Sequence, residues 1–162
     1  MTSRMAAIAF TGAMAAFACP VICPAPATAQ TVQEMEPLVF GTFVVPSNAA
    51  VSTLTIPLSG SVSTTGSIIA LTQGMPGRYR VGGLPGSAIV DIDVNAAPLF
   101  GAAVPASQFF QITAFDHPPT VITNAGGTAT FRLGATLSTS GSGVPYTEST
   151  YTGTIDITVT LQ

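Results

Sequence analysis

Two segments near the carboxyl-terminal end, 129–137 and 151–161, alternate apolar and polar side chains. In the second, for example, Ile157 and Val159 flank Thr158. A period of two residues places one set of side chains in a core and the other in solvent, which is the pattern of a β-strand. This alternation constrains the fold more than any other feature, and it predicts β-structure.

Shorter apolar runs, separated by Gly, Pro, Ser and Asn, predict further strands, and no stretch sustains a helical period. These runs are 38–44, 51–58, 67–71, 78–82, 88–94 and 109–115. Together with the two alternating segments they give about eight strands, which predicts an all-β, immunoglobulin-like sandwich of two sheets.

The amino-terminal segment is predicted to be an export signal. Arg4 precedes an apolar run over 5–18, and Ala27-Thr28-Ala29 offers the small residues that signal peptidase reads. The apolar run has 14 residues, fewer than the ~20 that a helix needs to cross a bilayer. A cleaved signal is therefore favoured over a membrane anchor. A lipid attached to Cys19 is the alternative.

The predicted organisation is a signal peptide at 1–29 and a single β-sandwich domain at 30–162, with no transmembrane segment in the mature chain. Such a protein is exported to the periplasm, the cell surface or the medium. Cys19 and Cys23 both precede the predicted cut. The mature chain then has no disulfide and no thiolate metal ligand, so that its stability has to come from burial.

The charge balance excludes several function classes. The chain has 4 Lys and Arg residues against 7 Asp and Glu residues, with a formal net charge of -3. This is too acidic for a nucleic-acid partner. The basic residues are Arg4, Arg78, Arg80 and Arg132. Without lysine, Schiff-base chemistry and a P-loop are excluded.

One hairpin is predicted in detail around the turn at 83–87. The register that satisfies both faces pairs Arg78 with Asp93, Tyr79 with Ile92, Arg80 with Asp91 and Val81 with Val90. Asp91 and Asp93 could form a carboxylate pair for catalysis or calcium. The favoured interpretation is a solvent-facing ion ladder, because each aspartate then has an arginine opposite it.

Candidate catalytic groups are few. His117 follows Asp116 and precedes two prolines, and we interpret it as a surface loop residue rather than a general base. A single histidine cannot form a two- or three-histidine metal site. The glycine pairs and triplets are predicted to form turns. Phe109, Phe110 and Phe115 are expected in the core. No catalytic, cofactor-binding or metal-binding residue is therefore predicted, no cofactor is expected, and the protein is not expected to be an enzyme.

Four motifs together resemble the bacterial exported family called domain of unknown function 4402. They are PLVFG at 37–41, GRYRVGGLPG at 77–86, RLGATL at 132–137 and YTGTIDITV at 151–159. The closing strand is the most specific of these motifs. The family's Gly-Gly is replaced here by Gly134-Ala135, and its usual final aromatic residue by Leu161. The resemblance supplies no catalytic residues.

A looser likeness links this family to subunits of chaperone-usher pili and to spore-coat-like proteins. It implies a sandwich completed by a strand from a periplasmic chaperone or from an identical or related subunit. The segment 151–161 is the expected acceptor edge. The donor would be Gln30 to Glu36, although that segment shows no clear alternation.

Two functions follow as expectations. The first is an exported structural or adhesive protein of the cell surface, fimbrial-like, joined by strand complementation. The alternative is a periplasmic or extracellular binding module with a self-complete sandwich, whose loops at 96–106 and 116–126 hold a small ligand or glycan.

The leader generates a direct prediction. Signal peptidase should cut after Ala29, so that mass spectrometry of the exported protein finds Gln30 as its first residue. An unprocessed Met1, or a lipid on Cys19, would show the prediction to be wrong.

Overall fold

The structure is a computed structural model that describes residues 30–102, 105 and 108–162. Within these ranges the chain forms thirteen strands and no helix, which confirms the predicted all-β class. The described part of the chain accordingly holds no helix long and apolar enough to span a membrane. The predicted leader at 1–29 lies outside the described residues.

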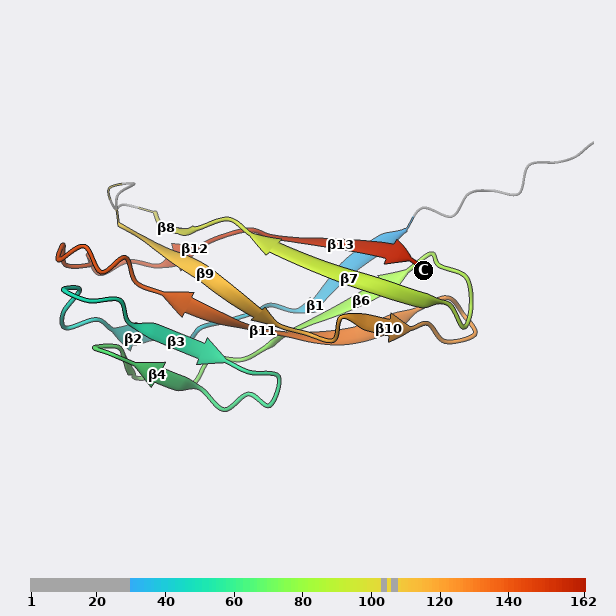
Figure 1. Ribbon diagram of the computed structural model, residues 1–162, viewed down its shortest axis with the longest axis horizontal. Helices are drawn as coiled ribbons and strands as arrows, with labels where there is room; N and C mark the ends of the chain where they lie inside the picture. Colours follow the sequence, from blue (N-terminus) through green and yellow to red (C-terminus); the bar gives the residue numbers. More distant parts are fainter. Residues whose placement is uncertain (1–29, 103–104, 106–107) are drawn as a thin grey trace, which may run out of the picture.

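The strands follow one another along an elongated molecule (Figure 1). Their bounds are β1 Thr31–Glu36, β2 Phe43–Val44, β3 Thr53–Ile56, β4 Ser63–Thr65, β5 Ile69–Ala70, β6 Gly77–Gly82, β7 Ile89–Ala96, β8 Leu99–Gly101, β9 Phe109–Asp116, β10 Thr120–Ile122, β11 Ala129–Ser138, β12 Tyr151–Thr152 and β13 Ile155–Leu161.

Three sheets build a sandwich-like arrangement. The largest runs β1-β6-β11-β9-β8-β12, with β3 and β4 added beside β11. A three-stranded sheet, β10-β7-β13, covers part of one face of the large sheet, and β2 and β5 form a small third sheet. All neighbours pair antiparallel.

The core has two lobes, and Phe115 packs against both of them. The first lobe contains Phe40, Leu54, Ile56, Ile68, Leu99, Phe110, Ala135 and Leu137. The second lies between β6 and β11 on one side and β7 and β13 on the other, and contains Tyr79, Val81, Val90, Ile92, Val94, Phe131, Leu133 and Val159. Of the three phenylalanines expected in the core, Phe110 is fully buried, and Phe109 and Phe115 are half-buried.

The predicted hairpin at 78–93 is wrong. β6 pairs with β1 and β11, whereas β7 pairs with β10 and β13 in the other sheet. Arg78 lies opposite Arg132 rather than Asp93, and Asp91 lies opposite Thr160 rather than Arg80. The chain crosses from one layer to the other at the turn. Period two assigns each side chain to a face, but it does not identify the neighbouring strand.

The predicted strand over 151–161 is divided. Tyr151 and Thr152 pair with β8 in the large sheet, and β13 begins only at Ile155, paired with β7. Gly153 lies at the break, where a Cβ would approach the Leu99 side chain to 3.1 Å. Four strands had no prediction: β1, β4, β8 and β10. With the exception of β1 they have three residues each, too short to display a period.

Gly134 allows β11 to contribute side chains to both lobes of the core. Before it β11 pairs with β6, and after it β11 pairs with β3 and β9. A Cβ at this position would clash with the carbonyl oxygen of Ile56 and lie 3.1 Å from the carbonyl carbon of Pro57. Only glycine permits the end of β3 to approach the β11 backbone so closely.

Gly134→Ala is therefore expected to destabilise the fold by about 1–3 kcal/mol, because two backbone segments would have to separate. Denaturant unfolding measures this loss. Gly82→Ala is the matched control, since its Cβ would meet Thr31 at an ordinary 3.4 Å. Equal stability of the two variants would contradict the close approach.

Candidate functional site

The outer edge of β13 is a strand edge that is open to a partner. β13 pairs with β7 over Ile155–Leu161 and ends the order β10-β7-β13, so within the described ranges no strand pairs with its other side. Backbone groups at such an edge can accept a strand from another chain. We call this side of β13 the open edge.

The hydrogen-bond pattern shows which groups face the open edge. Ala97 N–H donates to the Thr154 carbonyl at 3.0 Å, and Gln162 N–H donates to the Ile89 carbonyl at 3.2 Å. Pairs in an antiparallel ladder alternate between bonded and non-bonded. Even-numbered residues of β13 therefore bond to β7. The N–H and C=O groups of odd-numbered residues such as Ile157 point to the open edge.

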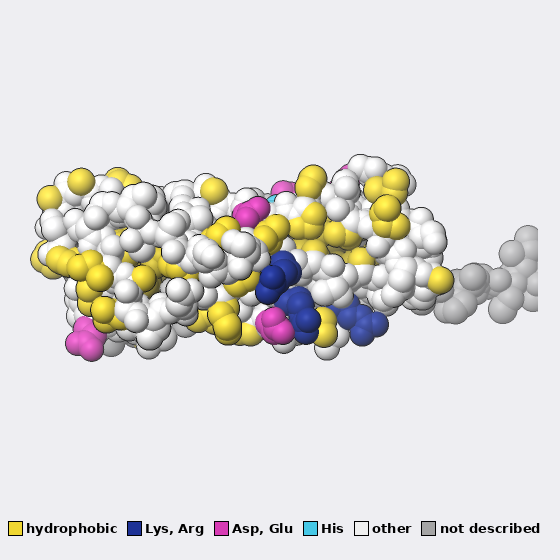
Figure 2. All heavy atoms as spheres, turned by 90° about the horizontal axis from the view of Figure 1, so that it is seen from below, with side chains coloured by type: hydrophobic (Ala, Val, Ile, Leu, Met, Phe, Trp, Pro, Cys, Tyr) yellow, Lys and Arg dark blue, Asp and Glu magenta, His cyan; other side chains and the backbone are white. Residues whose placement is uncertain are grey.

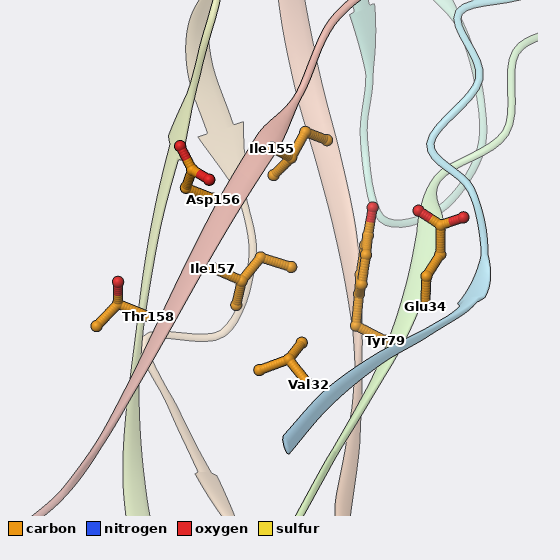
Figure 3. Close-up of a pocket in the computed structure, with 7 residues that line it drawn as sticks. All are labelled: Val32, Glu34, Tyr79, Ile155, Asp156, Ile157 and Thr158. Atoms are coloured by element: carbon orange, nitrogen blue, oxygen red, sulfur yellow. The ribbon is translucent and has the colours of Figure 1, made fainter. Parts of the chain in front are cut away.

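A groove of about 430 Å³ runs beside this edge (Figure 3). Its lining residues come from β1, β6 and β13 and are Val32, Glu34, Tyr79, Ile155, Asp156, Ile157 and Thr158. In Figure 3 Ile155 and Ile157 point from β13 toward Val32 on β1, and Asp156 and Thr158 point away. Both isoleucines pack on the second lobe of the core yet are only half-buried. The groove thus exposes apolar side chains next to backbone groups without a strand partner.

Tyr79 and Glu34 make one end of this groove polar. The Tyr79 ring is buried and stacks on Phe131 with centroids 5.8 Å apart. Burial raises the pKa of the Tyr79 hydroxyl, the nearby Glu34 carboxylate raises it further, and a hydrogen bond with the Leu38 backbone acts in the opposite direction. The hydroxyl is therefore neutral well into the alkaline range, and the negative charge at this end belongs to Glu34.

Gln30 already uses one acceptor of the open edge. Its side-chain amide donates to the Val159 carbonyl at 2.7 Å. That carbonyl is one of the odd-numbered groups that face away from β7, which agrees with the backbone pattern. The start of the amino-terminal strand β1 consequently lies beside the end of β13, across the groove.

β1 lies at the edge of the large sheet and has a single partner strand. Its six residues are all exposed, and it pairs with β6 alone, through a register that shifts between Glu34 and Glu36. Within this pairing, Glu36 forms a salt bridge with its partner Arg78 at 3.1 Å. Val32 and Met35 keep 40% and 47% of their surface exposed. Burial therefore contributes little to holding β1 in place.

The carboxylates singled out in the sequence do not line the groove. Asp91 and Asp93 point outward from β7, where Asp91 accepts a hydrogen bond from Gln162 Nε2 at 2.7 Å. The ion ladder predicted for them is wrong, since Thr160 and Thr158 lie opposite them on β13. No group of three or more His, Cys, Asp and Glu residues suited to a metal ion occurs within the described ranges.

His117 lies in the loop between β9 and β10, as predicted, and is half-buried. Its Nδ1 lies 3.0 Å from the Pro118 carbonyl, and the Asp116 carboxylate accepts a bond from Leu58 N–H at 3.0 Å. The carboxylate is thus directed toward β3 rather than toward the imidazole. The loop at 96–106, considered for ligand binding, lies partly outside the described residues.

Comparison with protein-family models identifies the chain. Residues 30–160 match the model described as Domain of unknown function (DUF4402). The chain belongs to this family. The DUF4402 match confirms the resemblance drawn from the four motifs. It spans β1 and nearly all of β13, so both sides of the groove are part of the DUF4402 region. No curated protein and no solved structure matches the chain significantly.

The sequence pattern predicted the strand that borders this groove but not the residues that lie across from it. The alternation of β13 correctly assigned Ile155, Ile157 and Val159 to one face. The approach of Val32, Glu34 and Gln30 was not foreseen, because β1 has a bulge at Met35 and its alternation is broken. The apolar residues of β1, Val32 and Met35, are three positions apart, so a period of two could not have indicated this strand.

The open edge makes a prediction for hydrogen exchange in the monomer. Amide protons of Asp156, Thr158 and Thr160 should exchange slowly because they bond to β7, whereas those of Ile155 and Ile157 should exchange quickly. NMR-detected exchange resolves the individual amides. Uniform protection along β13 in a monomer would show that its edge is covered.

Proposed function

We propose that this DUF4402 protein is an exported structural protein of the cell surface, whose copies are joined by adding a strand to the open edge of β13. The observation that carries the proposal is that unpaired backbone groups and exposed apolar side chains occur together at that edge. A seven-residue strand presents unpaired backbone groups, and the half-buried Ile155 and Ile157 lie directly beside them. An added strand would satisfy the backbone and cover the isoleucines at once.

The donor in this proposal is the segment 30–36 of a neighbouring copy. β1 supports this choice because it is exposed along its whole length and pairs with one strand only. Its preceding residue also reaches the open edge within the same copy, through the bond from Gln30 to Val159. Exchange of an identical segment between copies is a low-cost route to assembly, because each copy receives from its neighbour the same strand that it gives up.

A periplasmic chaperone fits the same edge as a temporary partner. Before a neighbouring copy arrives, the edge and its apolar groove need protection from unspecific pairing. A chaperone strand would supply the same backbone bonds and be displaced by the donor. The proposed location is accordingly outside the inner membrane, in agreement with the predicted leader.

Proline at position 157 tests the proposal. The Ile157 N–H faces the open edge, so Ile157→Pro should leave the pairing with β7 in place while blocking an incoming strand. Ile157→Ala is the matched control, because it shortens the same side chain and keeps the N–H. Each variant should lose about 1–2 kcal/mol of stability from the half-buried side chain. Only the proline variant should fail to form polymers, as measured by light scattering on folded, purified protein.

Deletion of 30–37 tests the donor separately. The truncated chain should bind a chaperone but form no polymer, and a synthetic peptide of 30–37 should bind to it in trans. Polymers that persist after the deletion would refute this donor. A full-length chain that stays monomeric with and without a chaperone would favour the self-complete binding module instead.

A further inference from the structure

The charged residues of β6, β7, β11 and β13 are separated by sign onto opposite sides of the sandwich. Arg78, Arg80 and Arg132 point outward from β6 and β11, and we call their surface the arginine face. Asp91, Asp93 and Asp156 point outward from β7 and β13, and their surface is the aspartate face. The second lobe of the core lies between the two faces.

The fold gathers all basic residues of the described ranges in one patch (Figure 2). Arg78 lies directly opposite Arg132 across the β6–β11 pair, and Arg80 is two residues along the same strand. Like charges placed opposite one another destabilise a sheet. Glu36 compensates Arg78 at 3.1 Å, and Arg132 donates to the Leu58 carbonyl at 3.2 Å. For Arg80, no salt bridge with an acidic residue occurs in the described structure.

Arg80 also lines a hollow that is suited to an anion. The hollow has a volume of about 250 Å³ and is lined by Thr31, Gln33, Arg80, Gly82, Gly83 and Thr128. Its side chains offer a guanidinium group, two hydroxyls and an amide, and the two glycines leave the backbone uncovered. None of the lining residues is acidic. A carboxylate entering here would meet a cation and several hydrogen-bond donors.

The aspartate face offers carboxylates in a matching arrangement. Asp91 and Asp93 are two residues apart on β7, and Asp156 lies on β13 opposite Asn95, diagonal to Asp93. The arginines have a similar layout, two along one strand and one on the neighbouring strand. No basic residue lies on the described part of β7 or β13. Both patches consist of side chains that point outward from strands, so they can contact a facing molecule.

We infer that the arginine face of one copy binds the aspartate face of a second copy, with an aspartate carboxylate in the Arg80 hollow. The partner is a second copy because the chain itself carries a complementary patch of the same size and layout. The two patches lie on opposite sides of each copy, so the contact is head-to-tail and repeats from copy to copy into a row or a ring. This contact is formed by charge and does not depend on strand addition at β13.

Residues 30–162 carrying Ile157→Pro provide the test, because strand addition is blocked in that background. Sedimentation velocity should show self-association at about 10 mM NaCl and monomers at about 1 M NaCl, where screening acts within about 3 Å. Arg80→Glu and Asp93→Arg should each weaken association by about tenfold or more, because like charges then meet. Their equimolar mixture should associate again, because the two reversed charges are opposite in sign and the faces left unchanged are also complementary.

Glu148→Lys is the control for net charge, because it makes the same change as Asp93→Arg in an exposed loop outside both faces. Its association should equal that of the parent chain. Association that ignores salt, or that survives both face substitutions, would overturn the inference. A parent chain that stays monomeric at low salt would also overturn the inference. If such a monomeric chain bound dextran sulfate through Arg80, the hollow would be assigned to an acidic polysaccharide. None of these results bears on strand addition, which the proline background removes.

Discussion

The close contact between the Gly134 backbone and the end of β3 connects the two halves of this fold. β11 can pair with β6 over its first half and with β3 and β9 over its second because nothing projects from Gly134 toward Ile56. Phe131 and Leu133 then enter one lobe of the core, while Ala135 and Leu137 enter the other. The position of the three-stranded sheet depends on this arrangement, because β7 and β13 pack on the lobe of the core that β6 and β11 provide.

Alternation predicted the faces of the strands well and their neighbours poorly. Val81 and Val90 both belong to the core, as their pattern indicated, but they meet across the sandwich rather than side by side in one sheet. The same apolar face satisfies either arrangement, since burial depends on what covers a side chain and not on which strand is bonded to it. A turn of five residues between two such segments therefore does not by itself distinguish a hairpin from a crossing between layers.

The candidate site depends on information that no single segment contains. That β13 offers an open edge follows from the strand order, and the direction of its free N–H groups follows from its pairing with β7. Arg132 joins Arg78 only because β11 pairs with β6 across more than fifty residues of chain. Composition could show that the chain has few charges, but only the topology shows that the arginines of β6 and β11 lie on the opposite side of the sandwich from the aspartates of β7 and β13.

The open edge also has a consequence for how the protein reaches its folded state. Natural sheets commonly guard such edges with lysine, proline or a bulge. β13 has none of these in the sequence IDITVTL, and its register with β7 is continuous over all seven residues. The edge therefore discriminates little between a correct strand and any other extended segment nearby. Under the proposed strand addition, the yield of correctly paired protein would depend on which strand reaches the edge first, and therefore on local concentration and timing as well as on affinity.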